Sequence, residues 1–226
     1  MLAAPRGDAG GASLLGLVAI MDRLRRECPW DAKQTHASLA PHLLEETYEA
    51  IDALERADMA ALAEELGDVL LQVVFHARVA AERTDGTGFT IDDVADGIAA
   101  KLVRRHPHVF AGVEVTGADD VKRNWDAIKA AERAQAGQER ISALDGVPLG
   151  QPALSLAGQL LHRAGRAGAP AELADLPGDG VSEIGAAIFA LAARAAAAGL
   201  DPELELRAAA RAYRKRVLDW ESSRGT

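Results

Sequence analysis

The stretch that decides the fold is 43–70, LLEETYEAIDALERADMAALAEELGDVL. Nine of its 28 residues are Asp or Glu, and Arg56 is its one basic residue. The remainder is rich in Leu, Ala, Ile and Val, which is typical of helices that pack into a core. Carboxylates held beside such a core repel one another and lose hydration, so they need a source of positive charge.

The rest of the chain also has a helical pattern. Ala, Leu, Glu and Arg dominate, and alternating strand patterns are hard to find. The segment TDGTG at 84–88 is a turn, and Thr90 with Asp93 predicts a helix cap after it. We therefore expect an all-α protein, with helices near 13–26, 38–56, 59–83, 91–105, 117–136, 152–168, 181–198 and 202–221.

Glycine and proline mark the expected domain limits. Residues 145–152, DGVPLGQP, hold two Gly and two Pro and predict a linker between domains at 13–144 and 153–226. Residues 1–12, MLAAPRGDAGGA, are small and Gly-rich, so we expect a disordered tail. A chain of 226 residues is long enough to bury two such cores.

The two halves resemble each other over short stretches. ELGDVLL at 65–71 is similar to EIGAAIF at 183–189, and KLVRR at 101–105 can be laid over AYRKR at 212–216. The second copy has alanine where the first has an acid and a lysine. We expect a duplicated helical unit whose degenerate second repeat serves packing or dimerisation.

Charge and cysteine content restrict the partners and the compartment. The formal net charge of −9 argues against a protein that coats a nucleic acid polymer. Cys28 is the single cysteine and cannot form an internal disulfide, which suits a reducing cytoplasm. Because no apolar run is long enough to span a bilayer, we expect no membrane partner.

The first pair of carboxylates precedes an apolar run. Residues 69–75, VLLQVVF, are apolar nearly all round, which predicts a buried helix. Glu65 and Asp68 are three residues apart, so they project together from the turn before this run.

The second pair lies on the preceding helix. Glu46 and Glu49 have the same spacing, and the short link at 56–58 makes the two helices antiparallel neighbours. Both pairs can then face one site without a nearby lysine or arginine. Hard oxygen ligands of this kind suit Mg²⁺ or Mn²⁺. Glu45, one residue outside the pair, could serve as an outer ligand or orient a water.

Other interpretations of these acids are less well supported. Acidic residues on helices usually form a solvated face, which is our interpretation of Asp52, Glu55 and Asp58. A di-iron bundle expects Glu-x-x-His pairs, and the chain contains none.

A cationic cluster follows at 101–110, KLVRRHPHVF. Lys101 and Arg105 share a helical face, and Arg104 lies on a neighbouring line. These cations could simply complement the carboxyl end of a helix. Beside a carboxylate–metal site, they would instead suit phosphate oxygens.

Together these motifs resemble the MazG nucleoside triphosphate pyrophosphohydrolases. Glu45-Glu46-x-x-Glu49, then fifteen residues, then Glu65-x-x-Asp68 fits the family's EExxE…ExxD signature. The similarity covers most of residues 14–160. The other stretches that carry it are CPWDAKQTH at 28–36, ELGDVLLQVVFHA at 65–77, KLVRRHPHVF at 101–110, NWDAIKAAE at 124–132 and SALDGVP at 142–148.

The resemblance implies a fold, an activity and a site. The fold would be an antiparallel helical bundle of the all-α NTP pyrophosphatase type, usually dimeric. The activity would be Mg²⁺-dependent hydrolysis of nucleoside triphosphates to monophosphate and pyrophosphate, for the removal of damaged or unwanted nucleotides. The implied metal ligands are Glu46, Glu49, Glu65 and Asp68. The residues implied to bind the nucleotide are Lys101, Arg104 and Arg105 at the phosphates, Trp125 and Lys129 from the following helix, and Trp30, Asp31 and Lys33 at the base.

A mechanism follows as a hypothesis. Water attacks the α-phosphorus, metal ions bridge the phosphates, and Glu45 or Glu49 helps to take the proton. One alternative is a non-catalytic helical dimer that binds metal or nucleotide as a regulator. Another is a related all-α enzyme that acts on dUTP or a phosphoribosyl metabolite. Neither a nucleophile motif nor a GxxxxGK[ST] phosphate loop is present.

Overall fold

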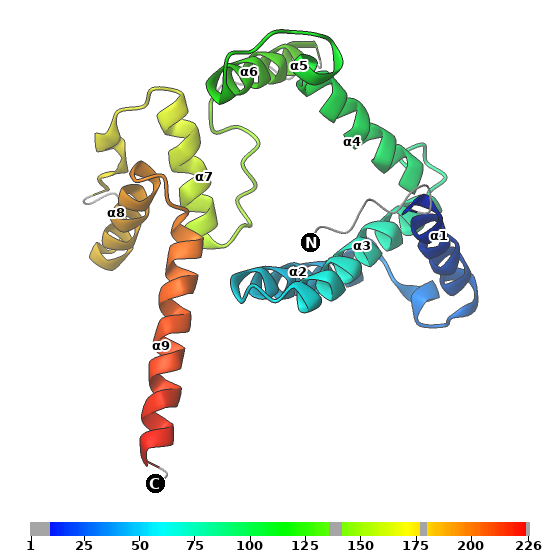
Figure 1. Ribbon diagram of the computed structural model, residues 1–226, viewed down its shortest axis with the longest axis horizontal. Helices are drawn as coiled ribbons and strands as arrows, with labels where there is room; N and C mark the ends of the chain where they lie inside the picture. Colours follow the sequence, from blue (N-terminus) through cyan, green and yellow to red (C-terminus); the bar gives the residue numbers. More distant parts are fainter. Residues whose placement is uncertain (1–9, 136–141, 177–179, 225–226) are drawn as a thin grey trace. The chain divides into compact units, whose positions relative to one another are not determined.

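The computed structural model describes residues 10–135, 142–176 and 180–224, and this part of the chain is helical without strands (Figure 1). This confirms the all-α prediction, and each expected helix is found. The short helices η1, α5 and η2 were not predicted. The elements are α1 (Gly10–Glu27), η1 (Asp31–Lys33), α2 (His36–Glu55), α3 (Met59–Ala80), α4 (Ile91–Arg105), α5 (Pro107–Phe110), α6 (Ala118–Gln135), α7 (Ala153–Arg166), η2 (Ala171–Ala174), α8 (Glu183–Ala197) and α9 (Pro202–Arg224).

The chain divides into two compact units, 1–129 and 130–226. The division falls before the predicted linker at 145–152. Helix α1 begins at Gly10, so residues 10–12 of the predicted tail are helical. The first N–H groups of a helix need no helical partner, so glycine is tolerated there. Residues 1–9 lie outside the described residues.

Among the described residues, no single helix is both long and apolar enough to cross a membrane. Helices α8 and α9 reach the required length and hydrophobicity only when taken together, and this pair is bent by 109°.

Local signals fix where α2, α3 and α4 begin. Thr35 and Ser38 form a capping box at the start of α2, and Thr90 and Asp93 form the predicted one at the start of α4. Asp58 accepts a hydrogen bond from the Ala61 N–H, so it caps α3 rather than belonging to a solvated face. These caps satisfy N–H groups that the helices leave unpaired.

The antiparallel pair α2–α3 is the frame of the first unit, and the two helices lie side by side in Figure 1. The link between them turns sharply, with Ala57 at a φ of 54°, in the left-handed region. Helix α1 packs against α3. The buried hydrophobic cluster at the centre of this unit consists of Met21, Leu39, Val74 and Phe75.

The run at 69–75 is only partly buried, which corrects the prediction of a buried helix. Val74 and Phe75 lie in the core, whereas Leu70 and Val73 are 39% and 37% exposed. Leu66, one turn earlier, is 53% exposed. Within the first unit, α1, α2 and α4 cover only part of the circumference of α3, so an apolar face remains at the surface.

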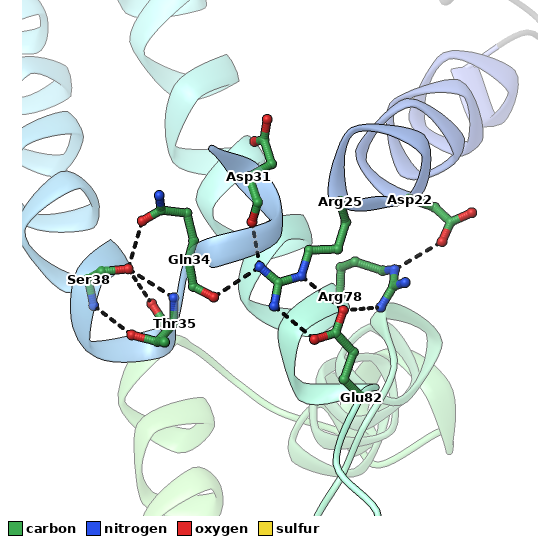
Figure 2. A network of polar contacts seen from close by, with 8 residues as sticks. All are labelled: Asp22, Arg25, Asp31, Gln34, Thr35, Ser38, Arg78 and Glu82. Atoms are coloured by element: carbon green, nitrogen blue, oxygen red, sulfur yellow. Dashed lines mark hydrogen bonds and ion pairs between the residues drawn. The ribbon is translucent and has the colours of Figure 1, made fainter. Parts of the chain in front are cut away.

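Arg25 fastens α1 to two other segments, as Figure 2 shows. Its guanidinium donates to the carboxylate of Glu82 at 2.8 and 2.9 Å, and to the backbone carbonyls of Asp31 and Gln34. The side chain is only 9% exposed. Arg25 therefore holds the loop with Trp30 against the end of α3.

Replacing Arg25 with Met is expected to lower the free energy of unfolding by about 2 kcal/mol, because two carbonyls lose a donor and the Glu82 carboxylate keeps only its bond from Arg78. Urea denaturation measures this change. Arg23→Met is the matched control, since Arg23 forms an exposed ion pair with Glu27 within α1. The control should cost less than about 0.5 kcal/mol. Equal losses in both variants would show that Arg25 does not fasten the loop.

The same network predicts how stability changes in acid. The hydrogen bond from Arg25 lowers the pKa of Glu82 from its ordinary value of 4.5, and Arg78 lowers the pKa of Asp22 from 3.8. Because the folded pKa values are depressed, this stabilisation is complete above the ordinary values and is lost as the pH falls below them. Thermal unfolding between pH 6 and pH 3 should show that loss, and the loss should be shallower in Arg25→Met.

Candidate metal centre

The antiparallel pairing of α2 and α3 brings carboxylates from both helices together. Oxygen atoms of Glu46, Glu49 and Glu65 all lie within 4.8 Å of one another. In the described part of the chain, this is the one group of three or more potential ligands with that spacing. Glu46 and Glu65 are half-buried, and Glu49 is exposed.

Burial and neighbouring carboxylates raise the pKa of two of these residues, Glu46 and Glu65. Burial raises the pKa of Glu46, and the negative charges of Asp68, Glu49 and Glu45 raise it further. Burial also raises the pKa of Glu65, together with the charge of Glu49 and a hydrogen bond between the two side chains. Within the described residues, no lysine or arginine is among the groups that shift either pKa.

Asp68 and Glu45 lie at the edge of this group. The charge of Asp68 acts on both Glu46 and Glu65, so it lies close to the site although it is outside the three-way cluster. Glu45 is exposed, and its Oε2 lies 3.9 Å from Nδ1 of His42. Arg56, the one cation of the opening stretch, pairs instead with Asp52 at 3.0 Å.

The donor set fits a divalent cation. Three carboxylate oxygens lie close enough to share one ion, and a fourth acid is nearby. All are hard oxygen ligands, which Mg²⁺ and Mn²⁺ prefer. A bound cation would supply the positive charge that this stretch of sequence lacks. The carboxylates would then be attracted to the cation instead of only repelling one another.

The predicted phosphate-binding cations lie in the last two turns of α4. Helix α4 meets the core through its first residue, Ile91. Lys101 is ten residues further along, about 15 Å down the helix axis, and Arg104 and Arg105 end the helix. Their role at the phosphates stays a prediction.

Trp125 and Lys129 form a cluster of their own on α6. Nζ of Lys129 lies 5.0 Å from the centre of the Trp125 ring, and that ring lies 5.6 Å from the His106 ring. The structure thus joins α6 to the end of α4, which places two of the predicted nucleotide-binding segments together.

Trp30 is closer to the carboxylate helix. Its ring centre is 6.2 Å from that of His42 and 6.5 Å from that of Phe75. Asp31 and Lys33 belong to η1 in the same loop, and the Lys33 side chain is exposed. The loop therefore lies near the start of α2 and the end of α3, at the opposite end of this helix pair from the link at 56–58.

Three polar side chains near the carboxylates were not among the predicted site residues. Nδ1 of His36 lies 2.8 Å from Nδ1 of His76, with the two rings stacked. Gln72 is buried between them and the carboxylates along α3. The sequence contains one signal for Gln72, because it is the one polar residue of the apolar run VLLQVVF. Burying a polar side chain costs free energy unless it finds a hydrogen-bond partner.

Comparison with known proteins identifies the family. Residues 34–110 match the model of the MazG nucleotide pyrophosphohydrolase domain. The chain is 39% identical over 224 residues to the "nucleoside triphosphate pyrophosphohydrolase/pyrophosphatase MazG" of Thermotoga maritima, and the match covers 91% of this chain and 84% of that protein. The chain therefore belongs to the MazG family.

Two further relatives differ in how much of their length is matched. An "uncharacterized 26.1 kDa protein in blaB 3'region" of Streptomyces cacaoi is 48% identical over 93% of this chain and 83% of its own length. The "nucleoside triphosphate pyrophosphohydrolase" of Mycolicibacterium smegmatis is 48% identical over 76% of this chain. The matched part is 52% of the mycobacterial protein, so this chain spans about half of that relative.

Proposed function

We propose that this protein hydrolyses ribo- or deoxynucleoside triphosphates to monophosphates and pyrophosphate, with Mg²⁺ or Mn²⁺ as cofactor. The observation that carries the proposal is the carboxylate cluster of α2 and α3, in which neighbouring carboxylates raise the pKa of Glu46 and of Glu65. The names of the Thermotoga and mycobacterial relatives support the same reaction.

Each carboxylate has a proposed role. Glu46, Glu49, Glu65 and Asp68 would hold the cation, which when bound neutralises phosphate charge and makes an attacking water more acidic. Glu45 is exposed beside the cluster and can accept a proton from that water, as can Glu49. Lys101 and Arg105 would bind the phosphate oxygens, since charged donors suit them.

We further propose a homodimer and a role in the removal of non-canonical or damaged nucleotides in the cytoplasm. The exposed apolar face of Leu66, Leu70 and Val73 supports association, because monomeric proteins seldom leave such a face uncovered. Analytical ultracentrifugation tests the dimer, and a purely monomeric protein would contradict it.

The test of the reaction is pyrophosphate release from ordinary, deoxy and oxidised nucleoside triphosphates. We expect pyrophosphate and the matching monophosphate in equal amounts with Mg²⁺, and no turnover in EDTA. Release of inorganic phosphate instead would mean cleavage at the γ-phosphate and would overturn the proposed reaction. Binding without any turnover would favour the regulatory alternative.

A further inference from the structure

Two histidines join the start of α2 to the end of α3. Nδ1 of His36 and Nδ1 of His76 are 2.8 Å apart, and the planes of the two rings differ by 1°. The ring centres are 5.1 Å apart, much further than these nitrogens, so each Nδ1 faces the other ring. The separation is that of a hydrogen bond, which needs a proton on one Nδ1 and a lone pair on the other.

The two rings differ in their exposure to water. His36 is exposed, whereas His76 is half-buried, and within the described residues its buried Nε2 atom has no hydrogen-bond partner. A proton on that nitrogen is an unpaired buried donor, which costs free energy, and the cost is greater when the ring is charged. Burial accordingly lowers the pKa of His76 from its ordinary value of 6.5, and the charge of His36 lowers it further.

The pair can hold one added proton but not two. With one, the exposed His36 is the imidazolium, and its Nδ1–H donates to the Nδ1 lone pair of a neutral His76. A charged donor makes this hydrogen bond stronger. With two, both Nδ1 atoms carry protons, so two N–H groups of like charge face each other and no lone pair remains between them.

The elements packed around this end of α3 carry other titratable or charged side chains. They include Asp22 and Arg25 on α1, Asp31 and Lys33 on η1, His42 and Glu45 on α2, Arg78 and Glu82 on α3 itself, and Asp92 and Asp93 on α4. Several are engaged elsewhere, since Arg25 and Arg78 both donate to Glu82. In the described part of the chain, His36 is the one charged group that shifts the pKa of His76. Proton uptake by His76 therefore depends on burial and on His36.

We propose that His36 and His76 form a proton-operated latch, which holds the first turn of α2 on α3 while at least one ring is neutral and releases it when both are charged. Leu39, one turn after His36, is 1% exposed and belongs to the core cluster with Phe75, the neighbour of His76. Release of the latch therefore opens one edge of the core of the first unit.

The pH range of the latch differs from that of the Arg25 network. Because the folded pKa of His76 is depressed, the stabilisation from the latch is complete above pH 6.5 and is lost as the pH falls through the folded value. The stabilisation that involves Glu82 and Asp22 is lost only below their ordinary values of 4.5 and 3.8. Measurements at pH 5.0 and above thus isolate the histidines from this network.

Hydrogen exchange at the Leu39 amide measures the release, because this N–H donates to the Thr35 carbonyl at 3.0 Å in the first turn of α2. Between pH 7.5 and pH 5.0, we expect its protection factor in the wild type to fall by about tenfold or more. His36→Asn keeps a group that donates or accepts near the position of Nδ1 but takes up no charge, so its protection should change by less than about twofold. His162→Asn, at an exposed histidine of α7, is the control and should behave as the wild type does.

An equal fall in His36→Asn and the wild type would overturn the latch, as would a constant protection factor in the wild type. Should His36→Asn not fold, NMR of the imidazole nitrogens in the wild-type chain decides, since it follows the protonation of His76 directly. His76 should titrate below pH 6.5, with Nδ1 carrying a proton in the doubly charged pair. A His76 ring that titrates at pH 6.5 or above would overturn the proposal.

Discussion

The rate of pyrophosphate release by the Glu65→Gln variant is expected to be at least about 100-fold lower than that of the wild type. Residues that only hydrogen-bond to a metal ligand typically contribute about 10- to 100-fold, and a ligand itself should contribute more. Glutamine keeps the shape of the side chain and removes its charge. The oxygens of Glu65 lie within 4.8 Å of those of Glu46 and Glu49, so the change also weakens the shared cation site. Steady-state kinetics with Mg²⁺ measures the loss.

The control is the neighbouring residue on the same helix. Glu64→Gln removes an exposed carboxylate outside the three-way cluster, so its kcat/KM should stay within about twofold of the wild type. Comparable losses in the two variants would indicate a general effect of charge on α3 rather than a metal ligand.

The Glu46→Gln variant should be more stable than the wild type without metal and less responsive to metal. Burial and three neighbouring carboxylates raise the pKa of Glu46, so its ionised form destabilises the metal-free fold at neutral pH. We expect the metal-free Tm to rise by about 2–4 °C. The increase in Tm that Mg²⁺ gives the wild type should largely disappear.

Thermal unfolding with EDTA and with Mg²⁺ gives both quantities. Glu114→Gln, in the exposed loop after α5, is the control and should alter neither. A lower metal-free Tm in Glu46→Gln would mean that its carboxylate stabilises the fold. The acidic cluster would then have a structural explanation.

The helices and the carboxylate cluster could be predicted because their signals are local. Pairs of acids three residues apart and a link of three residues leave little freedom in how α2 and α3 meet. Thr90 with Asp93 likewise marks a helix start within four residues. Each of these patterns lies within a short stretch of sequence, so it can be recognised without knowing the tertiary structure.

Features that depend on distant residues could not be predicted in this way. Arg25 and Glu82 are 57 residues apart, and neither segment contains a local pattern that predicts their pairing. The exposure of Leu70 and Val73 depends on which neighbours cover α3, so the apolar run alone gave the wrong burial.

The sharp link at Ala57 has a consequence for how the protein assembles. All four proposed metal ligands lie between positions 46 and 68, on the two arms of one helical hairpin. Contacts between residues so near in sequence close a short loop, and such contacts form early and quickly in folding. The cation site can therefore take shape as soon as this hairpin leaves the ribosome, before the second unit has been synthesised.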